Sequence, residues 1–434
     1  MSFFSQHIYN FLIKNEEQGT NLSKGASNNL ARNFTLNVCN GTLTKLAEKI
    51  ISPNITLAWI LSSLGASAGI IGALVPIKNA GSLLPQLAVS GKIRTYKIRK
   101  KFWVVSAITQ AICWLAAGLL ILFFSGSFIS TALLILLGLF SIASGVASVA
   151  YKDVTAKTIP KKIRGQMLSY RATFGGLFGL IAGAILIFLI KENENFSVYA
   201  YMFFAASLLW FLAALLFFAI REEKEKEQQE RNPLEEIKQG ISLIREDTSF
   251  RNFLFTRALL MAIPLLQPFY VIEAKQISTP NLNMLGYLII INGLATVLSS
   301  PFWGKIADQS STRLMRIASF ISIAGGIYAL AFYYFSEWNL GFYAFLPVFF
   351  INGIAYSGAR LSRKTYLVDY APADERPTYV SVANTFIGLF TIVAASFGLV
   401  AEAFGLPVQI IFFMSLLVIA VLLSFKLPKV TEGE

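Results

Sequence analysis

Long apolar runs, separated by short polar segments, dominate the sequence. A helix needs about 20 mainly apolar residues to cross the hydrocarbon core of a bilayer. Such runs occur near residues 31–64, 67–90, 102–125, 128–157, 163–190, 197–220, 250–274, 283–306, 313–336, 340–370, 376–403 and 406–427. The pattern predicts an all-α integral membrane protein with twelve transmembrane helices. The first run is the most polar and contains Pro53.

One long charged segment divides these runs into two sets of six. It reads REEKEKEQQERNPLEEIKQGISLIRED over residues 221–247. Isoleucines at helical spacing (Ile237, Ile241 and Ile244) predict a surface helix packed on the membrane domain, with a solvated connector as the alternative. We therefore divide the chain into a cytoplasmic leader (1–30), a first six-helix bundle (31–220), a linker (221–249), a second six-helix bundle (250–427) and a tail (428–434).

Composition and charge fit the same interpretation. Of the 434 residues, 55% are hydrophobic and 14% are charged, and the mean hydropathy is +0.60. The formal charge of +13 comes from residues between the apolar runs, so we expect the lipid bilayer, and not nucleic acid, as a partner. Lys and Arg gather on one side, as in 91–101 and 161–166, and the positive-inside rule then places both termini in the cytoplasm. We expect a monomeric, multi-pass protein of a bacterial inner membrane.

Composition also limits the chemistry of the protein. His7 is the sole histidine, and both cysteines, Cys39 and Cys113, fall inside predicted spans. Neither a histidine-based nor a cysteine-based metal site is therefore expected. The sequence contains no phosphate-binding G-x-x-x-x-G-K-[ST] loop. We expect no enzymatic activity, no cofactor and no metal.

The two halves of the sequence repeat each other. PKKIRGQMLSYRATFGGL (160–177) aligns without gaps on PADERPTYVSVANTFIGL (372–389), which places Arg164 on Arg376, 212 positions later. Two shorter matches keep the same order: GKI at 91–93 and 304–306, and RNF at 32–34 and 251–253. Matches in one order with similar offsets predict a duplicated six-helix unit. Transporters built from two related bundles bind their solute near the midplane between them.

A turn motif after the second helix of each half carries a family resemblance. GKIADQSSTR in the second half has Gly304, Asp308 and Arg313 at positions of the motif G-x-x-x-D-[RK]-x-G-[RK]-[RK], and GKIRTYKIRKK in the first half keeps Gly91 and the basic tail. Over residues 30–430 the chain resembles major facilitator superfamily transporters. The resemblance implies two pseudo-symmetric six-helix bundles that work by alternating access. It also implies a cytoplasmic gate formed by Gly91, Arg164, Gly304, Asp308, Arg313 and Arg376.

Two departures from the family pattern bear on mechanism. In the family, the motif aspartate helps to latch the two halves together, but Thr95 occupies its place in the first half, so Asp153 or another acid must substitute. GGLFGLIAGA (175–184) keeps three glycines of a drug-exporter motif but has Leu180 where that motif has proline. The glycines predict close helix packing, and the missing proline argues against the drug-exporter branch.

Lys78 lies near the middle of the second predicted helix. It is about 11 residues, or roughly 16 Å, from either helix end, farther than the ~6 Å that a lysine side chain reaches. An unpaired charge in the membrane costs several kcal/mol, so Lys78 must face the bundle interior. The predicted partner is Glu48 on the first helix, either in a structural ion pair or in a pair that opens during transport. Because Glu48 is the only carboxylate predicted to lie clearly deep in the membrane, it is also expected to couple transport to protons.

Other polar side chains inside the spans are candidates for solute binding. Polar residues recur every three or four positions on one face of the first helix, which must line a cavity or another helix: Asn33, Asn37, Asn40 or Gly41, Thr44 and Glu48. The expected solute-binding residues are Asn37, Thr44, Lys78, Asn79, Arg257, Gln267, Asn292, Asn352 and Tyr356. Four charged residues nearer the cytoplasm are assigned to the gate: Arg360, Arg363, Lys364 and Asp369.

Together these features predict a secondary active transporter of a small anionic or zwitterionic solute, working as a proton-coupled symporter. Lys78 and Arg257 favour a negatively charged group on the solute. One alternative is a proton-driven efflux pump for amphipathic compounds, which the aromatic content permits. Another is a sensor or assembly factor that no longer transports, which the altered first-half motif permits.

Overall fold

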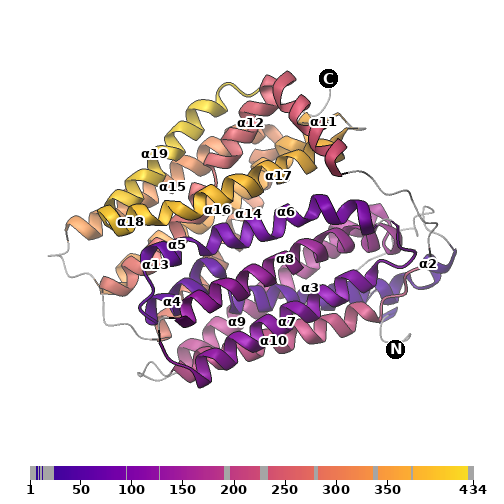
Figure 1. Cartoon of the computed structure of the whole chain (residues 1–434), viewed down its shortest axis with the longest axis horizontal. Coiled ribbons are helices and arrows are strands. Elements are labelled where there is room, and N and C mark those ends of the chain that lie inside the picture. Colours follow the sequence, from indigo (N-terminus) through magenta and orange to yellow (C-terminus); the bar gives the residue numbers. More distant parts are fainter. Residues whose placement is uncertain are drawn as a thin grey trace.

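The chain folds into long helices that run roughly side by side (Figure 1). The computed structural model describes residues 6–7, 9, 12, 24–93, 95–126, 128–189, 196–224, 233–277, 282–335, 341–372 and 375–428. Its longer helices are α3 (Leu30–Ile50), α6 (Leu74–Ile93), α7 (Lys100–Phe123), α8 (Phe128–Thr158), α9 (Lys161–Leu189), α10 (Phe196–Phe218), α11 (Pro233–Glu246), α12 (Thr248–Leu259), α13 (Ala262–Ile277), α14 (Leu282–Gln309), α15 (Ser311–Tyr334), α16 (Gly341–Tyr370), α17 (Arg376–Ala394) and α19 (Leu406–Ser424). The shorter ones are α2 (Lys24–Asn28), η1 (Pro53–Leu57), α4 (Ala58–Ser63), α5 (Ala68–Gly72), η3 (Ala395–Gly398) and α18 (Leu399–Phe404). Most of the predicted leader and tail lies outside the described residues.

Eleven helical stretches of the described chain are long and apolar enough to cross a membrane. The twelfth crossing is the first helix, in which α3, the π-helical turn η1 and α4 follow one another. The break falls at Pro53, because proline lacks the N–H that would continue the α-helical ladder. Ser52 Oγ accepts a hydrogen bond from the backbone N–H of Thr56 there. The chain is thus a multi-pass membrane protein with twelve spans, as the apolar runs predict.

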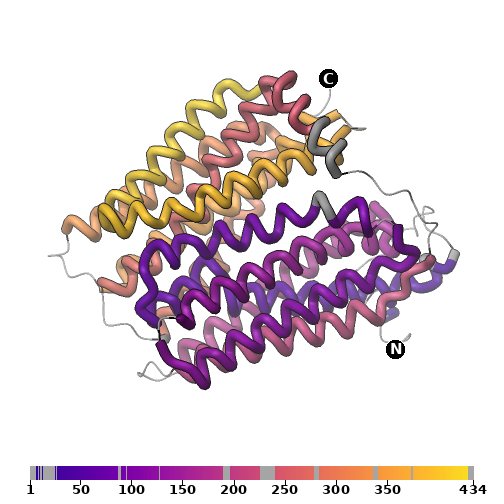
Figure 2. The backbone as a smooth tube through the Cα atoms, in the orientation of Figure 1, coloured from indigo at the N-terminus to yellow at the C-terminus, as the bar shows by residue number. Residues whose placement is uncertain are grey.

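The helices form two bundles of six (Figures 1 and 2). Helices α3 to α10 make the first half, drawn from indigo to magenta, and helices α12 to α19 make the second half above it. The helix α11 connects the halves at the end of the molecule where both chain termini lie (Figure 1). We call this end the linker end and the opposite one the far end.

Two pairs of glycines bring helices of different halves into close contact. A Cβ atom on Gly72 would lie 2.9 Å from Gly398 Cα, and one on Gly286 would lie 2.7 Å from the carbonyl oxygen of Gly183. The two contacts are equivalent in the repeat, since Gly286 is 214 positions after Gly72 and Gly398 is 215 after Gly183. The predicted two-fold pseudo-symmetry is therefore visible in the packing, and the predicted close approach of the glycine-rich helix α9 is confirmed.

Polar contacts between the halves close the far end. Asn54 Nδ2 donates to Gln267 Oε1 at 3.0 Å, and Lys275 Nζ donates to Ser63 Oγ at 2.5 Å. Both pairs join positions that are 213 and 212 residues apart, so they cross the pseudo-symmetry axis. Glu402 of α18 adds a hydrogen bond from a backbone N–H of α5 at 2.8 Å. Toward the linker end the two halves diverge (Figure 1).

The linker helix α11 lies against the second half. A Cβ atom on Gly240 would be 2.7 Å from Val382 Cγ2 on α17, and Ile244 packs against the hydrophobic core. Ile241 is exposed and lines the cavity between the halves that is described below. The side chain of Ile237 lies outside the described part of the chain. The structure favours the packed surface helix over the solvated connector.

Candidate functional site

Basic side chains of both halves lie close enough for their charges to act on one another, and Lys45, Arg360 and Lys364 among them are exposed. We call this set the basic cluster; it consists of Lys45, Lys49, Lys78, Arg171, Arg257, Arg360, Arg363 and Lys364. Charges interact across the two halves, as between Lys49 and Arg360 and between Lys364 and Lys45. Among the described neighbours that act most strongly on these groups, Glu48 is the one carboxylate. The cluster therefore carries a large surplus of formal positive charge.

Glycines of the first half make room for the cluster. A Cβ atom on Gly175 of α9 would lie 2.3 Å from Lys45 Cβ, and one on Gly179 would lie 3.1 Å from Lys49 Cγ. On α3 itself, a Cβ atom at Gly41 would lie 1.8 Å from Arg171 Nε. The glycine-rich segment of α9 thus has a second role besides helix packing, because it seats the stems of two lysines.

Glu48 forms its ion pair within its own helix. Lys45 Nζ lies 2.6 Å from Glu48 Oε2, and their side chains are 46% and 35% exposed. The predicted contact between Glu48 and Lys78 is wrong in this conformation, since no carboxylate of the described residues lies within 4 Å of Lys78 Nζ. The charge of Lys78 nevertheless acts on Glu48. A pair three residues apart on one helix forms without any tertiary contact, which explains why it prevails here.

Arg257 links the cluster to the helix α17. Its Nη2 donates to Asn384 Oδ1 at 2.9 Å, whereas its Nε is buried without a hydrogen-bond partner in the described structure. The neighbouring Arg363 donates from Nη1 to Met261 Sδ at 3.4 Å. Arg257 is thus buried in the structure, and its Nε is a donor without a partner among the described residues.

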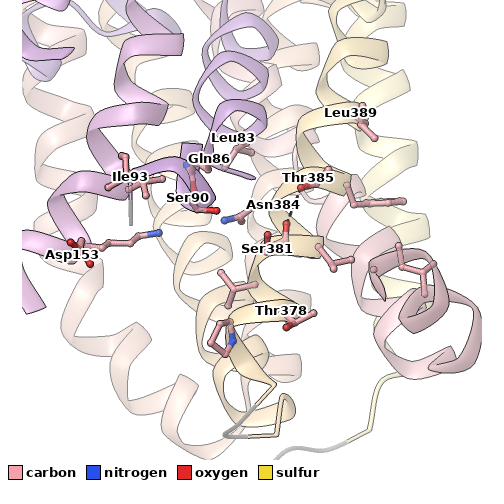
Figure 3. Close-up of a pocket in the computed structure, with 18 of the residues that line it drawn as sticks. Leu83, Gln86, Ser90, Ile93, Asp153, Thr378, Ser381, Asn384, Thr385 and Leu389 are labelled. Carbon is pink, nitrogen blue, oxygen red and sulfur yellow. Dashed lines mark hydrogen bonds between the residues drawn. The ribbon is translucent and has the colours of Figure 1, made fainter. Parts of the chain in front are cut away.

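A cavity of about 560 Å³ opens between the halves at the linker end (Figure 3). Gln86 and Ser90 of α6 lie on one side of it, opposite Ser381 and Asn384 of α17. Residues of α8 and of the linker helix α11 complete its wall. Because Asn384 also holds Arg257, the cavity borders the basic cluster.

The polar face of the first helix is mainly structural. Asn33 Nδ2 donates to the carbonyl oxygen of Arg221, and Asn40 Nδ2 donates to that of Ala213 on α10, at 3.0 and 2.8 Å. Asn37 lies between them on the same face and is fully buried, and Thr44 bonds back to its own helix. Asn37 and Thr44 therefore bond within α3, on the face that Asn40 presents to α10, and their part in solute binding stays a prediction.

The other expected solute ligands are spread over the two halves. Gln267 belongs to the closed far end through its bond to Asn54. Asn352 is buried, with a long 3.5 Å contact from Ser322 Oγ and no partner for its Nδ2 in the described structure. Tyr356 is half-buried beside Arg363. Asn79 and Asn292 are half-buried on different halves, and they do not bond to each other.

The first-half turn does have an acid at its basic tail. Arg99 Nη1 donates to both carboxylate oxygens of Asp153 at 2.6 and 2.7 Å. Lys157 Nζ lies 3.2 Å from Asp153 and 3.3 Å from Glu222. Asp153 of α8 thus pairs with the basic tail of this turn inside the first half, and its part in a latch between the halves stays a prediction.

The remaining gate residues have different surroundings. Arg164 donates to the carbonyl oxygens of Ile159 and Ala156 at 2.8 and 2.7 Å, so it caps the end of α8. Gly91 is buried, whereas Asp308 and Arg313 are exposed. A Cβ atom on Gly304 would have no neighbour within 4 Å. Arg376 begins α17 and is half-buried, with no partner for its Nε in the described structure.

Sequence reasoning missed part of the site. Lys45, Lys49 and Arg171 were not singled out, although all three lie inside predicted spans. The sequence feature that could have identified them is the recurrence of basic residues inside predicted spans. A second missed group is Glu273 of α13, a buried carboxyl whose two oxygens have no hydrogen-bond partner in the described structure.

Comparisons with known proteins agree with this fold. The sequence model of the Major Facilitator Superfamily matches residues 38–287 and 261–434. The uncharacterized protein Rv2209 of Mycobacterium tuberculosis is 22% identical over 292 residues, which cover 66% of this chain and 56% of that protein. The chain thus spans little more than half the length of this curated relative.

Solved transporter structures share the fold at low sequence identity. The inward-open xylose transporter XylE from E. coli is 17% identical, with a TM-score of 0.65 and coverage of 92% of this chain and 97% of that one. The nucleoside transporter NupG is 12% identical, with a TM-score of 0.65 and coverage of 90% of this chain and 98% of that one. A POT family transporter in complex with 5-aminolevulinic acid is 11% identical, with a TM-score of 0.70 and coverage of 91% of this chain and 95% of that one. Because the family model covers most of the sequence and the fold is that of these transporters, the chain belongs to the Major Facilitator Superfamily.

Proposed function

We propose that the protein moves a small anionic or zwitterionic solute across a bacterial inner membrane by alternating access, as a proton symporter. The solute binds between the halves at the basic cluster. Lys78 and Arg257 contact its negatively charged group, and Asn79, Asn292, Asn352 and Tyr356 supply hydrogen bonds. Family membership supports transport in general, and the basic cluster supports the charge of the solute.

The basic cluster carries this proposal. Like charges gathered at mid-depth in a membrane protein are costly unless water or an opposite charge compensates them. Both halves contribute members, for example Lys49 and Arg360, so a bound anion neutralises charge on both sides at once. Binding of this kind favours the state in which the halves approach each other around the solute.

The conformation supports alternating access from the cytoplasmic side. The far end is closed by contacts such as Asn54 with Gln267, whereas the 560 Å³ cavity lies between the halves at the linker end. The positive-inside rule makes the linker end cytoplasmic, together with both termini. In this interpretation the structure is inward-facing.

Glu48 provides the proton-coupling step. When Glu48 is ionised, it holds Lys45 in the observed ion pair. Protonation of Glu48 removes the partner of Lys45, which then faces the solute with its charge uncompensated. Proton binding and anion binding thereby favour each other, as coupling requires. Glu48→Gln is expected to abolish the dependence of uptake on a proton gradient while exchange of solute persists. Equal dependence on the gradient in this variant would contradict the assignment.

Transport by purified protein in liposomes tests the main proposal. Organic acids and amino acids are screened by thermal stabilisation in detergent, and hits are then followed as radiolabelled counterflow. Lys78→Ala and Arg257→Ala are expected to lose at least tenfold in affinity, whereas Lys305→Ala, at an exposed position outside the cluster, serves as the control. A protein that binds such a solute but never moves it would be a sensor and not a transporter.

Efflux of amphipathic compounds is the second candidate. The cavity at the linker end favours it, because Leu83, Ile93, Phe386 and Leu389 contribute apolar wall. An exporter would be stabilised by amphipathic cations, and that stabilisation would survive Lys78→Ala. The surplus of positive charge near the cavity argues for an anion instead.

A further inference from the structure

The charge balance of the basic cluster bears on the number of negative charges that the solute carries, as well as on the sign of its charge. Eight basic side chains meet one described carboxylate there, and that carboxylate is already paired with Lys45. A solute with one negative charge would leave most of the surplus uncompensated. Building on the transport function proposed above, we propose that the solute is a polyanion with at least two negative charges, such as a phosphate ester or a polycarboxylate.

The positions of the cations fit an extended ligand better than a single ionic contact. Lys49 and Lys78 belong to the first half, whereas Arg360 and Lys364 belong to the second, and their charges interact across the interface. One anionic group would leave most of these cations without an opposite charge. Two or three anionic groups on one molecule can compensate more of them, with each half holding a different end.

The guanidinium groups fit the chemistry of these anions. Arg257 Nε and Arg171 Nη1 are buried without a hydrogen-bond partner in the described structure. Guanidinium groups bind carboxylate and phosphate with two parallel hydrogen bonds, which a lysine cannot do. The glycines under Lys45 and Arg171 indicate that the sequence reserves volume for these long side chains, since a methyl group at Gly175 or Gly41 would collide with them.

A matched series of ligands tests the inference on the full-length protein. Propionate, succinate and tricarballylate carry one, two and three carboxylates on similar carbon chains, and glycerol with glycerol 3-phosphate tests a phosphate. Affinities are measured calorimetrically in detergent at pH 7 and constant ionic strength. We expect Kd to fall at least tenfold from propionate to the preferred polyanion. The carboxylate and phosphate arms then identify which anion the site prefers.

Variants connect the affinity to the cluster. Lys49→Ala and Lys364→Ala remove one charge from each half, and each is expected to weaken polyanion binding by roughly 10- to 100-fold. Lys305→Ala is the matched control at an exposed position of α14 and should bind as the wild type does. Because the substitutions relieve repulsion, both cluster variants should melt at or above the wild-type temperature, which separates lost binding from lost folding.

The outcomes also separate this inference from the proposed transport. Charge-independent affinity, or preference for propionate, alanine or a neutral sugar with measurable counterflow, would overturn the polyanion and leave transport standing. Polyanion binding with no counterflow would support the solute class and contradict transport. If none of the polyanions binds, or if binding is unaffected in both cluster variants, the inference fails.

Discussion

The contact between α5 and η3 at the far end offers a direct test of how the halves close. A Cβ atom on Gly398 would lie 3.0 Å from Gly69 Cα and 3.1 Å from the carbonyl oxygens of Ala68 and Gly69. All three obstacles are backbone atoms, so no side-chain rotation can relieve the overlap. Since non-bonded carbon atoms prefer about 3.5–4.0 Å, Gly398→Ala must push the two halves apart by about 0.5–1 Å.

The magnitude follows from the cost of overpacking. Inserting a methyl group into a well-packed contact costs roughly 1–3 kcal/mol. Because α5 and η3 belong to different halves, this cost falls on the state closed at the far end and not on a state open there. We therefore expect Gly398→Ala to shift the closed-to-open ratio about 5- to 150-fold toward the open state. Gly176→Ala is the control, because a Cβ atom there has no neighbour within 4 Å.

Distance measurements across the far end provide the assay. Spin labels are placed at Phe124→Cys and Phe335→Cys, exposed positions at the far ends of α7 and α15, in a background without the native cysteines. Pulsed EPR in liposomes should show a larger long-distance population in Gly398→Ala than in the wild type and in Gly176→Ala. An unchanged distance distribution in a folded Gly398→Ala protein would refute the reasoning.

Three further predictions concern stability and the site. Asp153→Asn leaves the buried guanidinium of Arg99 without its ion pair and should lower the free energy of unfolding by roughly 2–4 kcal/mol, whereas Asp308→Asn at an exposed position should change it by less than about 0.5 kcal/mol; thermal melts compare the two. Gly175→Ala places a methyl group 2.3 Å from Lys45 Cβ and should weaken solute binding in calorimetry, while normal binding would show that the lysine is not part of the site. Glu273→Gln keeps the shape of a buried carboxyl that has no described partner, so its melting temperature should equal or exceed that of the wild type; a clear loss would reveal a partner for that carboxylate.

Much of the fold could be read directly from the sequence. The twelve spans follow from apolar runs, because the thickness of a bilayer sets the length that a helix must have. The repeat predicted two related bundles, and equivalent glycine contacts at Gly72–Gly398 and Gly183–Gly286 confirm that symmetry. Asp153 does bond to the basic tail of the first-half turn, but inside one half, so its part in a latch between the halves stays a prediction.

The candidate site could be predicted only in part. Depth along a helix can be counted from the sequence, and Lys78, expected to face the bundle interior, is half-buried in the structure. Which charged side chains pair with each other could not be worked out from positions along the chain, and Glu48 pairs with Lys45 rather than with Lys78. A stripe of polar residues shows that a helix face is covered, but not by what. In the structure, Asn40 of that stripe bonds to α10, whereas Glu48 pairs with Lys45.

The sequence by itself therefore determined the class of protein, the number of spans, the duplication and the depth of each charge, because each depends on distances along a single chain. The tertiary structure decided which of those charges meet. That outcome depends on the rotation of each helix about its axis and on small residues such as Gly175 and Gly41, which fix how closely the helices approach. The basic cluster forms only because helices that are far apart in the sequence pack together in one particular arrangement.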